Sequence, residues 1–344
     1  MRRIVVLGGL GFFGRTIVEL LREASASPVV ASRSAKADVR VNVEDTPSIR
    51  AALQADDVVI DTVGPFQDRS TALLEAAIEV GFDLVDISDS ISYGGKIKRL
   101  RPGIEARPIR VLTACSAMSA ITAAMIKLSG VQEPLRVIGF IAPASRYTAN
   151  SATGESLLRS IGRPIHVLRE GELVTRVGWR ERRILRPPPP LGRIRGHLVE
   201  TVDSLTLPPV WPSLRTVELY VDARVPALNV VFSVAARVPA VHRFVVRQRS
   251  VGLLLARLLG RRVGGLAYEI EANSGTVVRC TLAAEERSYR IPVLPTVLAA
   301  QAIASGRFVH HGLVPPDHHV ELGELLRSFE AHGVTLATES TSNY

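Results

Sequence analysis

The 344-residue sequence contains few cysteine, lysine and aromatic residues. Its two cysteines, Cys115 and Cys280, are too few for a disulfide scaffold and form no C-x-x-C pair, so a reducing, cytoplasmic compartment is expected. No apolar run approaches the roughly 18 to 20 residues that span a bilayer, and glycine and proline recur without a period. These absences exclude membrane-spanning, collagen-like and disulfide-rich classes and leave a globular protein, with two domains expected from its length.

The basic residues are strongly biased towards arginine, which provides 38 of the 42, and the formal net charge is +9. Such a charge permits binding to phosphate-bearing partners, but no nucleic-acid-binding motif accompanies it, so no nucleic-acid partner is expected. At the N-terminus, Arg2 and Arg3 precede an apolar run, as in a signal peptide. Charged residues at helical spacing follow between Arg15 and Glu23, so we interpret the run as the start of a folded domain.

Residues 4–113 alternate short apolar runs with helical patterns. Thr46 with Pro47 behind it predicts a helix start, and Gly81 predicts a helix end. Alternation of this kind predicts a doubly wound parallel sheet covered by helices on both faces. The expected strands are residues 4–7, 28–31, 57–61, 83–87 and 109–113.

A glycine motif follows the first expected strand. Gly9, Gly11 and Gly14 form G-x-G-x-x-G between this strand and a helical pattern. Each glycine position excludes a side chain where the chain turns, approaches a pyrophosphate or packs against the strand. The amides at the helix N-terminus favour phosphate, so the motif predicts dinucleotide binding.

The end of the second strand indicates which dinucleotide binds. An acidic residue about 20 residues after the glycines bonds the ribose 2′-hydroxyl of NAD. Here the strand ends in Ser32 and Arg33, with no acid before Asp38. A hydroxyl and a guanidinium suit a 2′-phosphate, whereas a carboxylate repels it, so NADP is predicted and NAD is the less favoured alternative.

Three further segments carry a family resemblance over about residues 1–115. Residues 57–66 contain an expected strand followed by Gly-Pro-Phe, and residues 76–81 contain the end of a helical pattern that finishes with glycine. Residues 84–88 have the sequence Leu-Val-Asp-Ile-Ser. Their order and spacing resemble the saccharopine dehydrogenase-like NAD(P)-binding family, which includes saccharopine reductases and trans-acting enoyl reductases. The resemblance implies a Rossmann domain, an NADP(H)-dependent oxidoreductase, and hydride transfer between nicotinamide and an amino, imino or conjugated carbonyl substrate.

The resemblance also assigns residues to the cofactor. The pyrophosphate would lie against the glycine turn, the adenosine ribose against the end of the strand at 28–31, and the path to the nicotinamide along the loop after the strand at 57–61. The expected cofactor residues are Gly9, Gly11, Phe12, Phe13, Gly14, Ser32, Arg33, Thr62, Gly64 and Pro65.

The candidate catalytic residue is Asp86, at the end of the strand at 83–87, where it would orient substrate or relay a proton; the alternative is a structural cap. Cys115 is interpreted as a small buried apolar residue, because no histidine is placed near it. Residues 114–119 depart from the Gly-x-Asp-x-x-Pro-like stretch of the family. This departure motivates an alternative function, a catalytically degenerate NADP-binding sensor or membrane-surface adaptor.

The second half of the chain changes character. Turn residues at 170–171 and 273–275 lie between apolar runs and predict hairpins, hence an antiparallel or mixed sheet in a second α+β domain. We expect residues 1–125 to form the dinucleotide domain and residues 126–291 a substrate and dimerisation domain, making a homodimer. Residues 292–344 are expected to return to the first domain as helices.

Two remaining patterns concern other partners. Residues 241–262 are rich in arginine and leucine and read as a basic amphipathic helix, which suits surface or dimer packing or a weak membrane-surface association. The histidines at 310–311 and 318–319 match no ligand spacing, so no metal is predicted.

Overall fold

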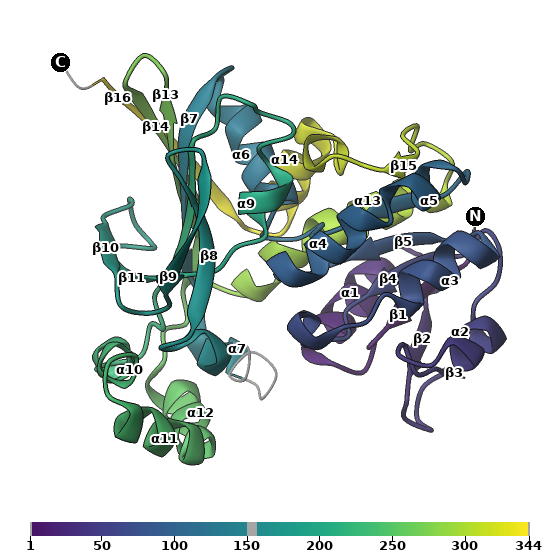
Figure 1. The fold of residues 1–344 in the computed structure, drawn as a ribbon, viewed down its shortest axis with the longest axis horizontal. Helices are drawn as coiled ribbons and strands as arrows, with labels where there is room; N and C mark the ends of the chain where they lie inside the picture. Colours follow the sequence, from purple (N-terminus) through teal and green to yellow (C-terminus); the bar gives the residue numbers. More distant parts are fainter. Residues whose placement is uncertain (1, 150–156, 343–344) are drawn as a thin grey trace. The chain divides into compact units, whose positions relative to one another are not determined.

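The structure is a computed structural model that describes residues 2–149 and 157–342. It divides into two compact units. The first contains Met1–Ala124 and Pro292–Leu326, and the second contains Met125–Ile291 and Arg327–Tyr344. Figure 1 shows the strands and helices of each unit.

The described residues of the first unit form a seven-stranded sheet, in which every pairing is parallel. The strand order is β15-β6-β5-β4-β1-β2-β3, and the reversal between β1 and β4 is the switch point at which such sheets bind ligands. The expected Rossmann fold class is confirmed. The strands are β1 (Ile4–Leu7), β2 (Val29–Ser32), β3 (Val39–Arg40), β4 (Val58–Asp61), β5 (Asp83–Asp86), β6 (Arg110–Leu112) and β15 (Gly312–Leu313).

Helices cover both faces of this sheet. On one face, Val5, Leu7 and Val59 pack in a buried apolar cluster with side chains of the helices that follow β3, β4 and β5. On the other face lie the first helix, against β1, and a late helix, against β4 and β5. Strand side chains alternate between the two faces, so the interiors of β1, β4 and β5 are apolar on both faces, and the aspartates of β4 and β5 stand at strand ends. The helices are α1 (Phe12–Glu23), α2 (Thr46–Ala52), α3 (Ala72–Val80), α4 (Ile91–Arg99), α5 (Arg101–Glu105) and α13 (Leu294–Ala304).

One helix start differs from the expectation. Thr46 is the first residue of α2 rather than its cap, and Asp45 occupies the cap position with extended backbone. Pro47 lies in the first turn, where its missing N–H costs no hydrogen bond. The end of α3 follows the sequence, since Gly81 adopts the left-handed conformation with φ 94°.

The described residues of the second unit form a nine-stranded mixed sheet. Its path is β10-β11-β12-β7-β13-β14-β16, with β8 pairing with both β12 and β9. The β12–β7 pair is parallel and its other pairs are antiparallel. The strands are β7 (Pro134–Ala142), β8 (Pro164–Arg169), β9 (Glu172–Val177), β10 (Arg182–Leu185), β11 (Ile194–Val199), β12 (Thr216–Val221), β13 (Gly264–Ala272), β14 (Thr276–Ala284) and β16 (Thr335–Ser342).

The last strand corrects the expected domain limits. Residues 292–326 join the first unit, but residues 327–344 join the second. The reason is β16, which pairs antiparallel with β14 from Thr276 opposite Ser342 to Ala283 opposite Thr335. The expected helix before it is present as α14 (Leu322–Ala331).

The basic segment 241–262 is also corrected, because it is not one helix. It contains most of α11 (Pro239–Arg247) and all of α12 (Arg249–Leu259), and α10 (Leu228–Ala235) precedes them. Gln248 separates α11 from α12 with φ −94° and ψ 19°, outside the helical range. Gly260 then turns to extended backbone and ends α12.

Other helices of the chain are α6 (Ala120–Ser129), α7 (Ser145–Thr148) and α9 (Asp203–Thr206). Within residues 2–149 and 157–342, no helix combines the length and apolarity needed to cross a bilayer.

Candidate cofactor and active site

The glycine turn after β1 brings the predicted phosphate-binding residues together. Gly8 has φ +73°, and a Cβ on it would lie 2.7 Å from Thr62 Oγ1. Gly11 N donates to Gly8 O at 2.7 Å, which closes the turn. Gly8 was not among the predicted residues, although it stands directly before the motif; its left-handed φ makes it the residue on which the turn depends.

Helix α1 begins at Phe12 with its first turn close to the strand end. A Cβ on Gly14 would lie 2.2 Å from Gly8 O, so glycine is required there for helix packing rather than for a ligand. Gly11 occupies the cap position without a side chain to accept from the helix amides, and the first turn contains no acidic residue. The positive end of the helix therefore has no acidic residue in its own first turn to neutralise it.

The predicted ribose site lies at the end of β2. Ser32 is half-buried and Arg33 is exposed. Asp38, the nearest acid along the chain, accepts a hydrogen bond from Val30 N at 2.9 Å. Its carboxylate is thus engaged by the backbone of β2. Arg40 lies on β3 opposite Ser32 in register, which adds a second exposed cation to this corner of the sheet.

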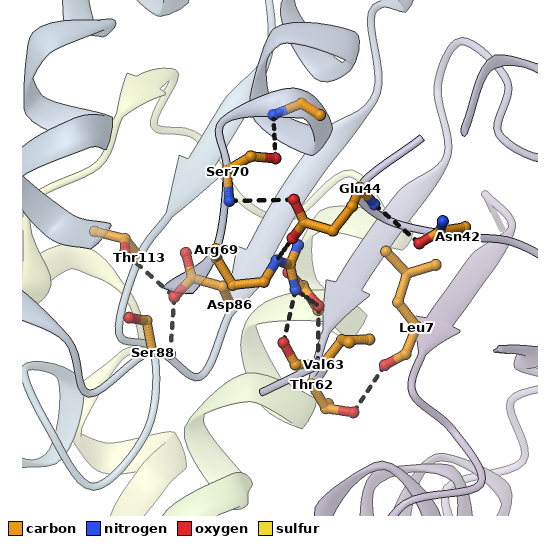
Figure 2. A network of polar contacts seen from close by, with 12 residues as sticks. Leu7, Asn42, Glu44, Thr62, Val63, Arg69, Ser70, Asp86, Ser88 and Thr113 are labelled. Carbon is orange, nitrogen blue, oxygen red and sulfur yellow. Dashed lines mark hydrogen bonds and ion pairs between the residues drawn. The ribbon is translucent and has the colours of Figure 1, made fainter. Parts of the chain in front are cut away.

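The loop after β4 is held by a polar network (Figure 2). Thr62 Oγ1 donates to Leu7 O at 2.7 Å and so joins this loop to the end of β1. Arg69 donates to Val63 O at 2.6 Å, and its guanidinium lies 2.9 Å from Asp61 Oδ2 and 2.7 Å from Glu44 Oε1. The backbone between these anchors contains the predicted Gly64 and Pro65, joined by a cis peptide bond.

The Arg69 network was missed from the sequence. Arg69 and Asp61 are 4% and 0% exposed, so this is a buried ion pair in which the arginine connects two carboxylates. Burial raises the pKa of Asp61, and the charge of Arg69 opposes this rise. An acid at the end of a strand was the available signal for Asp61, but nothing distinguishes Arg69 from the other arginines in the sequence.

Asp86 ends β5 directly beside Asp61 in register and is fully buried. Its Oδ1 accepts from Ser88 N and Ala114 N, both at 2.9 Å, and from Thr113 Oγ1 at 3.2 Å. Its Oδ2 is buried with no hydrogen-bond partner among the described residues. Burial raises the pKa of Asp86 to about 6 against these hydrogen bonds, so the carboxyl can change protonation near neutral pH.

Tyr93, on the first turn of α4, presents a second buried polar atom. Its hydroxyl has no hydrogen-bond partner among the residues that the structure describes. Burial and the charges of Asp86 and Asp61 raise the pKa of this hydroxyl well above its usual value. The hydroxyl therefore stays protonated and can donate a hydrogen bond, and it lies in the electrostatic field of the two carboxylates.

The segment after β6 is fixed to these carboxylates. Asp86 O accepts from Cys115 N at 2.8 Å, in addition to the side-chain contacts with Thr113 and Ala114. Ala114 and Ser119 have φ 55° and 53°, an uncommon conformation for residues other than glycine. Cys115 is fully buried, as expected, and burial raises the pKa of its thiol well above the usual value, which disfavours the reactive thiolate.

The four strand ends together define the candidate site. In a parallel sheet, the carboxyl ends of β1, β2, β4 and β5 lie at one edge, so the glycine turn, Arg33, the Thr62 loop and Asp86 share that edge. Each predicted site residue lies there. No group of three or more His, Cys, Asp or Glu within the described ranges is arranged to hold a metal.

This geometry is that of a dinucleotide-binding Rossmann domain, and the comparisons with known proteins name its relatives. Residues 4–128 match the family model "Saccharopine dehydrogenase NADP binding domain". The resemblance to the saccharopine dehydrogenase-like NAD(P)-binding family is therefore confirmed for these residues, which form an NAD(P)-binding domain.

Solved structures extend the likeness of the fold to the rest of the chain. An apo saccharopine dehydrogenase (L-Glu forming) from Saccharomyces cerevisiae is 14% identical over 99% of this chain and 100% of its own, with a TM-score of 0.64. The two proteins share a fold in both units. No curated protein matches the sequence significantly.

Two further dehydrogenases are more distant. The myo-inositol 2-dehydrogenase from Lactobacillus plantarum is 8% identical over 97% of this chain and 98% of its own, with a TM-score of 0.43. The WlbA (WbpB) dehydrogenase from Thermus thermophilus, in complex with NAD and alpha-ketoglutarate, is 10% identical over 94% of this chain and 92% of its own, with a TM-score of 0.41. At these scores neither supports a conclusion about this chain.

Proposed function

We propose that the protein is an NADP(H)-dependent oxidoreductase that transfers hydride between the nicotinamide and an amino, imino or conjugated carbonyl substrate. The glycine turn carries this proposal. Gly8 adopts a left-handed backbone, Gly11 N closes the turn by donating to Gly8 O, and α1 begins beside this turn without a capping side chain. That arrangement fits a pyrophosphate at the switch point between β1 and β4.

The preference for NADP rests on the charges at the end of β2. A ribose 2′-phosphate needs cations and hydroxyls and is repelled by a free carboxylate. Arg33, Lys36 and Arg40 are exposed there, and the carboxylate of Asp38 is engaged by Val30 N. This corner therefore supplies positive charge where an NAD-specific protein would place an acid.

Bound NADP supplies the hydride carrier, and the protein's own residues position it. Thr62 and Arg69 hold the loop that contains Gly64 and Pro65 at the end of β4. Asp86 acts in this proposal as a positioning residue, because its side chain has no exposed surface and three donors bind it to the loops after β5 and β6. The second unit would bind the substrate and form the homodimer.

Calorimetric titration with NADPH and NADH tests the cofactor assignment. We expect tighter binding of NADPH, and we expect Arg33→Ala to weaken NADPH binding by about tenfold or more while NADH binding stays unchanged. Arg22→Ala is the matched control, since Arg22 is an exposed arginine in the last turn of α1, away from the glycine turn. Equal affinities for both nucleotides would refute the NADP preference, and no binding of either would refute the function.

The role of Asp86 has its own test. Once a substrate is found in a screen of amino acids, keto acids and enoyl compounds, Asp86→Asn should lower kcat and abolish the dependence of kcat on a group titrating near pH 6. NADPH affinity should change little, because Asn retains the acceptor that Ser88, Thr113 and Ala114 bind. An unchanged rate and pH profile would remove Asp86 from the mechanism.

A second function is favoured by the same burial. Asp86 at the end of β5 and Cys115 after β6 are both at 0% exposure, so neither the candidate acid nor the thiol presents a surface to a substrate. A cofactor-binding sensor or adaptor that has lost turnover fits this observation. Tight NADPH binding without turnover across the substrate screen would establish this alternative.

A further inference from the structure

Helices α10, α11 and α12 carry an unusual share of exposed apolar side chains. Of the seventeen large hydrophobic residues that are exposed in the described part of the chain, eleven lie between residues 230 and 259. The three helices contact one another in sequence within the second unit (Figure 1). The apolar residues are Val230, Val231, Val234, Val238, Phe244, Val246, Val251, Leu254, Leu255, Leu258 and Leu259. Such a concentration marks a surface that binds a partner.

Helix α12 is amphipathic, and its apolar face is the one exposed to solvent. Ala256 is its only buried residue, whereas Val251, Leu254 and Leu258 are 50%, 55% and 59% exposed. These three and Leu255 follow the i, i+3, i+4, i+7 spacing of a single helix face. In a helix that packs on a core, this face would be buried and the polar one exposed; here the apolar face is directed outwards.

Helix α11 repeats this arrangement. No residue of α11 is buried, and Phe244 is 64% exposed. A buried phenylalanine is favoured over an exposed one by about 1.5 to 3 kcal/mol, so leaving it in water is a cost that an occupant of this surface would remove.

Positive charge accompanies the apolar surface. Seven arginines lie from residue 237 to residue 262, and no acidic residue occurs between Asp222 and Glu269. Arg243, Arg247 and Arg249 are exposed around the junction of α11 and α12. The other four are Arg237, Arg257, Arg261 and Arg262.

We propose that α10–α12 form a docking surface for an anionic lipid bilayer, with α11 and α12 lying in the plane of the interface. The outward apolar side chains would enter the boundary between headgroups and acyl chains, and the arginines would bind lipid phosphates. Charge selects this occupant over a second copy of the chain. A twofold contact through the same surface would place seven arginines against seven arginines without an acid between them.

Vesicle flotation of the full chain tests the proposal. Vesicles of phosphatidylcholine alone are compared with vesicles containing 30% phosphatidylglycerol, at low salt and in roughly 0.5 M salt, where surface charges are screened within about 4 Å. We expect binding to the anionic vesicles only, lost in high salt. Arg243→Gln/Arg247→Gln/Arg249→Gln should weaken partitioning by about a hundredfold, at roughly fivefold per arginine. Leu254→Ser/Leu258→Ser should weaken it by about a hundredfold as well.

Matched variants separate this surface from general charge and apolarity. Arg22→Gln/Arg99→Gln/Arg287→Gln removes three exposed arginines elsewhere, and Leu173→Ser/Ile184→Ser removes two exposed apolar side chains. Both should bind vesicles like the unaltered chain. Unchanged circular dichroism verifies that each variant folds, and it keeps this test independent of the proposed function.

The following outcomes would overturn the proposal. Absence of binding to anionic vesicles at low salt would exclude a bilayer. If Arg22→Gln/Arg99→Gln/Arg287→Gln weakened vesicle binding as much as the variants of the docking surface do, the binding would be an effect of net charge. The surface would be assigned to a second copy if the unaltered chain dimerised in sedimentation equilibrium without binding vesicles, and if Leu254→Ser/Leu258→Ser abolished that dimerisation.

Discussion

The ends of β4 and β5 place two aspartates side by side in contrasting surroundings. Asp61 and Asp86 are partners in register, and both are fully buried. Asp61 faces the guanidinium of Arg69 at 2.9 Å, whereas Asp86 receives only neutral donors. Burial raises the pKa of both carboxyl groups, and only at Asp61 does the charge of a partner, Arg69, oppose that rise.

The contrast predicts its largest effect at Arg69. Arg69→Met leaves Asp61 as a buried, unpaired charge and should cost about 3 to 5 kcal/mol of stability. Hydrogen exchange of the β1, β4 and β5 amides measures this, because Trp179 and Trp211 both lie in the second unit and their fluorescence would not report on the first.

Arg50→Met is the control for Arg69→Met. Arg50 pairs with Glu79 at 2.5 Å, but their side chains are 52% and 56% exposed. An exposed pair contributes about 1 kcal/mol or less. Similar losses in the two variants would mean that burial of the Arg69 pair is unimportant.

The next effect concerns the same substitution at both aspartates. Asp61→Asn removes the charge that compensates Arg69 but leaves it Glu44 and Val63 O, so it should cost about 2 to 3 kcal/mol by hydrogen exchange of β4. Asp86→Asn removes a charge that nothing compensates and keeps the acceptor at Oδ1. At pH 7.5 it should leave stability unchanged or raise it. If Asp61→Asn and Asp86→Asn destabilised the protein equally, the difference between the two aspartates would be refuted.

The difference between unaltered chain and Asp86→Asn should depend on pH. The folded pKa of Asp86 is raised to about 6, against roughly 3.9 for an unfolded aspartate. Protonation therefore favours the folded state: this contribution is fully present below about pH 4 and is lost as pH rises through about 6. The unaltered chain should gain about 2 to 3 kcal/mol relative to Asp86→Asn between pH 7.5 and 4, measured by hydrogen exchange corrected for intrinsic rates. A constant difference would place the pKa of Asp86 near its ordinary value.

Local patterns made much of this edge predictable. A strand, the Gly9-x-Gly11-x-x-Gly14 turn and the start of α1 are consecutive in sequence, and each follows from steric rules over a few residues. The Rossmann order of the sheet then placed Thr62 and Asp86 at the same edge without any long-range information.

What escaped prediction depends on partners far apart in the chain. Thr62 bonds Leu7 across 55 residues, and Arg69 is distinguished from 37 other arginines only by Asp61 and Glu44, which fold against it. Strand β16 belongs to the second sheet because β14 offers a free edge, a fact that its own threonine-rich sequence does not contain. Helical periodicity continues through Gln248, so the pattern concealed the break between α11 and α12.

The smallest predicted effect isolates one of the neutral donors to Asp86. Thr113→Val removes a buried hydrogen bond of 3.2 Å and should cost about 1 kcal/mol at pH 7.5. The bond from Thr113 favours the ionised carboxyl, so its loss should raise the pKa of Asp86 further and shift the pH dependence of stability upwards. Thr71→Val is the control, since Thr71 Oγ1 donates to the carboxylate of Glu75 at 2.8 Å on the exposed surface, where water replaces the lost donor. If both variants showed the same small loss and no shift with pH, Thr113 would be a packing residue, and the ionisation of Asp86 would depend on the backbone donors Ser88 N and Ala114 N alone.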